Sequence, residues 1–150
     1  MARLREQIIT QTPIEKTFAY TADINNIQDW DPGIAESAQI GDGPVGQGTQ
    51  FDVLVAFGAR RTPMVYTITE YDAPRRVVLV GEGSNLTAID EITFAEVPEG
   101  TAVTYTADLA FEGFMRFVAP FLGNLLKGVG RKAVNGLAEA LAKIETPVGS

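Results

Sequence analysis

The chain has 150 residues, of which 45% are hydrophobic and 21% charged, as expected for one globular domain spanning residues 1–150. It contains no cysteine and no histidine, which excludes disulfides, thiolate nucleophiles, Cys/His metal sites and a Ser-His-Asp triad. The net charge of −7 disfavours nucleic acids and anionic membranes as partners.

One strand and a first short helix are predicted at the N-terminus. Partial alternation of apolar residues predicts a strand over residues 3–11. Thr12, Pro13 and Glu15 then follow the pattern of a capping box, in which the threonine side chain caps the first amides of a helix. This helix is expected to end near Thr21. Apolar residues recur on one side of it at intervals of four: Ile14, Phe18 and Ala22.

A second short helix is predicted directly after the first. Asp23 can cap it, and residues 31–33 contain the proline and glycine that end it. The residues that share its apolar face are Ile24, Ile27 and Trp30. Two consecutive short helices of this kind can support a sheet that curves past them.

Residues 34–112 predict strands and turns only. The segments with strand-like patterns are residues 34–40, 49–57, 63–71, 77–80, 86–94 and 101–111. Short turns between them make successive strands antiparallel neighbours, and their alternation leaves one face of the sheet in water. The glycine-rich stretch 41–48 favours a hairpin loop over a phosphate-binding loop, because a strand follows it and no lysine is near.

The longest helical pattern covers residues 114–145, where apolar residues recur every three or four positions. Because Pro120 lacks an amide proton, we predict that the main helix begins near it, with residues 114–118 as a separate turn or kinked lead-in. Several glycines allow either close packing or a wall of little side chain beside a ligand: Gly123, Gly128, Gly130 and Gly136.

The order of elements predicts an α+β fold. A strand, two short helices, six strands and one long helix are best satisfied by a strongly curved seven-stranded antiparallel sheet wrapped around the C-terminal helix. A helix that is apolar over so much of its surface needs a large cover, and little except strands precedes it.

Caps and turns along nearly the whole chain carry a family resemblance. They are TPIEKTF at 12–18, AD at 22–23 followed by WDP at 30–32, GPVGQGT at 43–49, YDAPRR at 71–76 and GTAVTY at 100–105. With these the chain resembles the SRPBCC (START-like, Bet v 1-like) superfamily, and within it the polyketide cyclase/dehydrase-type proteins. The resemblance implies a helix-grip fold with a deep cavity between sheet and long helix, which holds a lipid, polyketide, sterol or other hydrophobic molecule.

Asp90 is the most informative polar residue, because it shares one side of its strand with apolar residues such as Ala88 and Ile92. A carboxylate there is costly to bury unless it is paired or protonated. Facing a cavity, it would bind a polar group of a ligand or act as a base with a raised pKa. The alternatives are a bulge that places it in water, or an ion pair with an arginine.

Tyr66 and Tyr105 lie on apolar faces and are either core residues or pocket residues whose hydroxyl groups need partners. With Asp90 they are the candidate catalytic residues. Arg60 and Arg61 lie at a hairpin and are expected to be solvated. The residues expected to line the cavity are Trp30, Phe51, Val53, Val55, Tyr66, Asp90, Ile92, Tyr105, Phe117, Phe121 and Leu125.

Three functions remain open from the sequence. The first is binding or carriage of a hydrophobic small molecule such as a lipid, polyketide or other aromatic or isoprenoid compound. The second is an enzyme of cyclase or dehydratase type, a lyase or isomerase, in which Asp90 and a tyrosine serve as acid and base. The third is an interaction module with a vestigial cavity.

The expected setting of the protein is cytoplasmic, because no apolar run is long enough to cross a membrane and the N-terminus lacks a signal-peptide pattern. We expect a hydrophobic small molecule as partner, no nucleic acid, no membrane insertion, and a monomer or homodimer. No acidic cluster has the spacing of a carboxylate metal site, so neither a metal nor a cofactor is expected.

Overall fold

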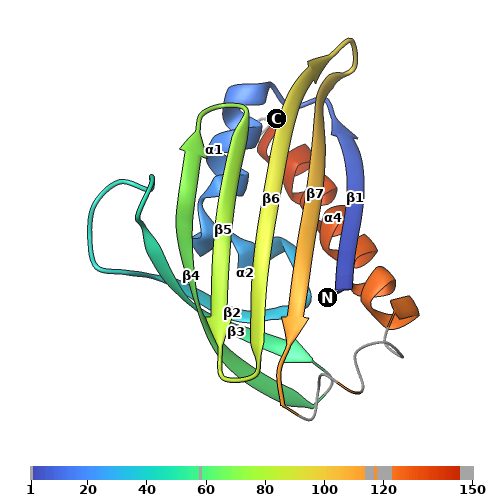
Figure 1. Ribbon diagram of the computed structural model, residues 1–150. Helices are drawn as coiled ribbons and strands as arrows, with labels where there is room; N and C mark the ends of the chain where they lie inside the picture. The colour runs from blue at the N-terminus through green and yellow to red at the C-terminus, as the bar shows by residue number, and fades with distance from the viewer. Residues whose placement is uncertain (1, 58, 114–116, 118–122, 146–150) are drawn as a thin grey trace.

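The computed structural model describes residues 2–57, 59–113, 117 and 123–145. A seven-stranded antiparallel sheet in the order β1-β7-β6-β5-β4-β3-β2 curves around one long helix, which confirms the predicted fold (Figure 1). The elements are β1 (Ala2–Thr10), α1 (Ile14–Ala22), η1 (Ile24–Asn26), α2 (Ile27–Trp30), β2 (Ile34–Ile40), β3 (Gln50–Phe57), β4 (Arg60–Asp72), β5 (Arg76–Gly83), β6 (Leu86–Val97), β7 (Gly100–Phe111) and α4 (Gly123–Glu145).

Every predicted strand is present, and the largest difference relative to the expected length is in β5. It was expected over residues 77–80 but runs from Arg76 to Gly83, because it pairs with β4 and β6 along this whole length. Its continuation through Gly81 was missed, since glycine is depleted from strands and usually marks a turn.

The turn before α1 differs from the predicted capping box. The helix begins at Ile14, one residue after the expected start at Pro13, and none of the described side chains caps it. The Thr12 hydroxyl instead donates to the carbonyl oxygen of Leu141 on α4, 3.0 Å away. Because Thr12 is fully buried, this distant partner replaces the local one. The predicted cap by Asp23 is confirmed, since its Oδ1 accepts from the amide of Asn25 at 3.1 Å.

The hydrophobic core lies between the inner face of the sheet, the short helices and the C-terminal half of α4. Phe18 of α1 makes edge-to-face contacts with Tyr71 and Phe94, with ring centroids 5.1 Å apart in both pairs. The predicted apolar faces of the short helices are buried, and α4 contributes buried residues from its second half: Ala133, Val134, Leu137 and Leu141.

Helix α4 approaches α2 closely at Gly136. A Cβ atom at this position would overlap the carbonyl oxygen of Trp30. Close packing therefore explains Gly136, with α2 rather than the sheet as the neighbour. The predicted start near Pro120 and lead-in over residues 114–118 fall outside the described residues, apart from Phe117.

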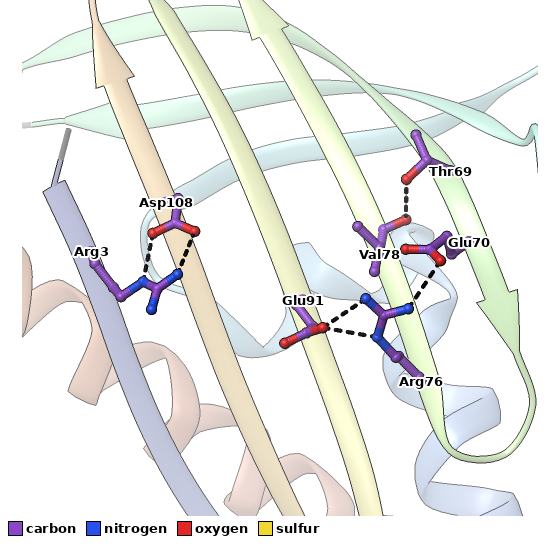
Figure 2. Close-up of polar contacts among 7 residues, drawn as sticks. All are labelled: Arg3, Thr69, Glu70, Arg76, Val78, Glu91 and Asp108. Carbon is purple, nitrogen blue, oxygen red and sulfur yellow. Dashed lines mark hydrogen bonds and ion pairs between the residues drawn. The ribbon is translucent and has the colours of Figure 1, made fainter.

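The outer face of the sheet is polar, as the strand alternation predicts. Figure 2 shows Arg3 of β1 paired with Asp108 of β7 at 2.8 Å, and Arg76 of β5 bridging Glu70 and Glu91 at 3.0 and 2.8 Å. Inward-facing residues, by contrast, supply the core and the space described below. None of the described helices combines the length and hydropathy needed to cross a membrane.

Candidate functional site: a cavity with an acidic inner end

A cavity of about 730 Å³ lies between the inner face of the sheet and α4. Much of its wall is apolar, and the β7 residues that face it alternate as predicted: Tyr105, Ala107, Leu109 and Phe111. Helix α4 contributes small residues, among them Gly130, whose position has Leu4 of β1 as its neighbour. This glycine lines the cavity with backbone rather than side chain.

Asp90 and Tyr105 meet at the inner end of the cavity. Asp90 pairs in register with Ala107, so Tyr105 is its diagonal neighbour on the adjacent strand. The tyrosine hydroxyl donates to Oδ2 of Asp90 at 2.5 Å. Asp90 is only 6% exposed, and no arginine pairs with it among the described residues. Of the alternatives for this carboxyl group, burial facing a cavity is therefore the one observed.

Burial dominates the electrostatics of this end. It raises the pKa of Asp90 to about 7, although the Tyr105 hydrogen bond acts in the opposite direction. Burial also raises the pKa of Asp31 to about 6, against the lowering effect of the Gly33 amide that donates to its Oδ1 at 2.8 Å. The pKa values of Tyr66 and Tyr105 lie well above 10, first because of burial, so both phenols stay protonated near neutral pH.

Tyr66 enters the site because its neighbour on β5 has no side chain. Tyr66 and Gly81 are register partners, and a Cβ at Gly81 would come within 2.6 Å of the tyrosine ring. The ring thus lies across the backbone of β5. Gly81 is a positioning residue that sequence reasoning assigned to a loop.

A smaller void of about 10 Å³ adjoins the acidic end and is lined by Trp30, Tyr66, Asp90 and Tyr105 among others. Its volume is close to the minimum for a single water molecule. The indole Nε1 of Trp30 is buried and has no hydrogen-bond partner among the described residues.

The predicted cavity residues fall into several places. The cavity itself is lined by Val55, Tyr66, Asp90 and Tyr105. The adjoining void is lined by further predicted residues: Trp30, Val53 and Ile92. Phe51 is fully buried in the core and lines neither space, and the side chain of Phe117 is 67% exposed. The side chains of Phe121 and Leu125 lie outside the described part of the chain.

Sequence reasoning missed Asp31, Glu6 and the two arginines of β4, which also line the cavity. Arg60 lies an even number of residues from Tyr66, so strand alternation alone predicts the same face for both. Asp31 carried no such signal, because it lies in the turn after α2 and its direction depends on tertiary packing. The described residues contain no group of three or more acidic side chains that could hold a metal ion.

A second hollow of about 740 Å³ lies on the other side of α2, against α4. It shares Asp31 and Ile34 with the cavity, but polar side chains such as Gln28, Lys132 and Glu139 line much of it. The cavity between the sheet and α4 is more enclosed and more apolar, so it is the better site for a hydrophobic molecule.

Solved structures with little sequence identity share this fold. A protein from Thermus thermophilus is 15% identical with a TM-score of 0.82, covering 96% of this chain and 99% of that one. The Zhui aromatase/cyclase from Streptomyces sp. R1128 is 13% identical with a TM-score of 0.77, covering 99% and 98%. A START superfamily protein from Mycobacterium smegmatis is 14% identical with a TM-score of 0.69, covering 96% and 97%.

Sequence comparison identifies the family to which the chain belongs. No curated protein sequence matches the chain. The family model described as polyketide cyclase / dehydrase and lipid transport matches residues 1–142, which include every described strand and most of α4. The expected START-like, SRPBCC character is thereby confirmed: the chain belongs to the polyketide cyclase / dehydrase and lipid transport family.

Proposed function

We propose that this protein binds a hydrophobic small molecule in the cavity between the sheet and α4. The observation that carries the proposal is the cavity itself, whose volume of about 730 Å³ is that of a small-molecule site. Contact between the ligand and the apolar side chains removes apolar surface from water and so supplies affinity, while the few polar groups at the inner end orient the ligand. Membership of a family of cyclases, dehydrases and lipid-transport proteins supports the same conclusion.

Filling the cavity should strongly weaken binding. Ala107 faces it and is 4% exposed, so Ala107→Phe places a ring where the ligand would lie. Ala102→Phe is the matched control on the same strand, because it faces outward beside the exposed Ile9. We expect the wild-type protein and the control to bind the neutral dye Nile red, with at least about tenfold weaker binding by Ala107→Phe.

Circular dichroism and thermal unfolding establish that both variants are folded. Equal dye binding by the two variants contradicts a ligand site in the cavity. Native mass spectrometry of the protein purified from its own host then identifies any compound that is retained.

An enzyme of cyclase or dehydratase type is the second candidate, and the Asp90–Tyr105 contact favours it. A carboxyl group whose pKa lies near 7 is suited to accept and return a proton, and the adjacent phenol is a donor. Turnover of a hydrophobic polyketide-like substrate that Asp90→Asn abolishes without loss of binding is the expected evidence. A cavity of this volume does not support the third function, an interaction module with a vestigial cavity.

A further inference from the structure

Asp31 and Asp90 face the cavity without a positive partner among the described residues. No ion pair within this part of the chain involves either carboxyl group, whereas the outer-face carboxylates Glu91 and Asp108 each have an arginine. Oδ1 of Asp90 and Oδ2 of Asp31 accept no hydrogen bond from the described residues. Both carboxyl groups therefore line the same mostly apolar cavity with unused acceptor capacity. Asp31 also borders the second hollow, where Lys132 and Lys143 of α4 form no ion pair with it among the described contacts.

The other charged groups that face the cavity do not fill this role. Helix α4 and strand β3 contribute only uncharged lining residues among those described, and β1 adds a further acid, Glu6. The only cations among the described lining residues are Arg60 and Arg61 of β4. Arg60 lies six residues from Tyr66 along an extended strand, which is about 20 Å. The arginines are thus at the opposite end of the cavity from Asp90.

The group that would complement the inner end is a compact cation with several hydrogen-bond donors. A ligand hydroxyl offers one hydrogen and no charge, whereas an ammonium group offers three hydrogens and attracts both carboxylates. We propose that the ligand of this cavity is a hydrophobic amine whose protonated nitrogen binds between Asp31 and Asp90, with its apolar part directed toward the β3–β4 hairpin. This inference rests on the proposed binding function and specifies its ligand class.

Binding of an amine should be coupled to proton release from Asp31 and Asp90. In the empty cavity burial favours the protonated carboxyl groups, with pKa values of about 7 for Asp90 and about 6 for Asp31. An ammonium group stabilises the carboxylates, so each carboxyl group that ionises on binding releases one proton to solvent. Amine affinity should therefore fall as the pH drops below about 7, because the carboxyl groups must then lose protons before binding.

The test compares dodecylamine, dodecanol and dodecanoate, which share one chain length and differ in charge. Trp30 is the single tryptophan of the chain and lines the void next to Asp90, so its fluorescence reports occupancy of the inner end. At about pH 8, where the buried carboxyl groups are largely ionised and the amine is protonated, we expect dodecylamine to bind at least about tenfold more tightly than dodecanol. Titration calorimetry at about pH 6, where the buried carboxyl groups are still partly protonated, should detect proton release with the amine alone when buffers of different ionisation enthalpy are compared.

Variants separate specific binding from general attraction to an acidic protein. Asp31→Asn and Asp90→Asn should each weaken dodecylamine about tenfold and leave dodecanol almost unchanged. Asp108→Asn removes the same charge on the outer face and should change neither. The amine inference is overturned if dodecanol or dodecanoate binds as tightly as dodecylamine, or if all three variants lose dodecylamine affinity equally. Either result leaves the proposed binding of a hydrophobic molecule intact. No binding of any of these compounds or of Nile red overturns both proposals.

Discussion

At the scale of single residues, the site depends on one carboxyl group held among apolar neighbours. Asp90 is buried next to Ala88 and Ile92 on its own strand, and its one side-chain partner among the described residues is the Tyr105 hydroxyl. Burying a carboxyl group without a cation disfavours its charged form. The folded protein is therefore more stable when Asp90 is neutral or when a ligand compensates its charge.

Replacing Asp90 should stabilise the empty protein above neutral pH. Its folded pKa of about 7 exceeds the unfolded value, so folding takes up a proton between these values and stability falls as pH rises from about 4 to about 7. Asp90→Asn removes this cost and should raise the free energy of unfolding at about pH 8 by up to ~4 kcal/mol, with little change at about pH 4. Urea unfolding at both pH values measures the difference.

The companion variant Tyr105→Phe should raise the pKa of Asp90 above its value in the wild type. The phenol hydrogen bond lowers that pKa, so its loss should raise it further, as carbon-detected NMR titration of the carboxyl group would show. A lower pKa in Tyr105→Phe, or greater stability of wild type than of Asp90→Asn at high pH, contradicts the assignment of Asp90 as an unpaired buried acid.

At the scale of elements, α4 is positioned by contacts at its C-terminal half. Gly136 allows the helix to approach the end of α2, and the Thr12 hydroxyl binds the carbonyl of Leu141 near the start of α1. The sheet side of the cavity is thus set by strand register, and its helix side by these two contacts together with the packing of α4 against β1. Movement of α4 at Gly136 would also displace Trp30, which borders the inner void.

Two glycine variants of α4 should have opposite effects on stability. Gly136→Ala introduces a methyl group that overlaps the Trp30 backbone, and we expect it to destabilise by roughly 1–3 kcal/mol. A Cβ at Gly128 meets nothing within 4 Å, so Gly128→Ala should stabilise by up to ~1 kcal/mol through helix propensity. Denaturant unfolding compares them, and destabilisation of both variants to the same extent contradicts close packing at Gly136.

At the scale of the whole molecule, a curved sheet around one helix leaves a hollow that the described side chains do not fill. Interiors of proteins are otherwise packed like organic crystals, so a space of about 730 Å³ forgoes dispersion contacts that an occupant would restore. The outer face contributes solvent-exposed ion pairs, which add little to stability. Occupancy of the cavity should consequently be visible in global stability.

A bound ligand should raise the melting temperature in a concentration-dependent way. Ligand at one hundred times its dissociation constant adds about 2.7 kcal/mol to the free energy of unfolding. Thermal shift assays with the tightest compound of the dodecyl series should show this increase for wild type and for Ala102→Phe. The same increase in Ala107→Phe would place the ligand outside the cavity.

Local patterns of the sequence predict much of this architecture. The cap by Asp23, the spacing of Ile14, Phe18 and Ala22, and the alternation along β7 depend on neighbours a few residues away, so periodicity reveals them. Strand alternation likewise placed Asp90 and Tyr105 on apolar faces. The predicted capping box failed for the converse reason, since Thr12 found its partner on a helix at the other end of the chain.

The sequence by itself therefore determined the elements, their order and the polarity of each strand face, because these follow from short-range sterics and the burial of apolar side chains. Tertiary structure alone decided that Tyr105 reaches Asp90, that Gly81 makes room for Tyr66, and that Asp31 turns toward the same cavity. These contacts depend on strand register and on the direction of a turn. The register and the direction of the turn are set when the whole sheet closes around α4, so no pattern within one segment predicts them.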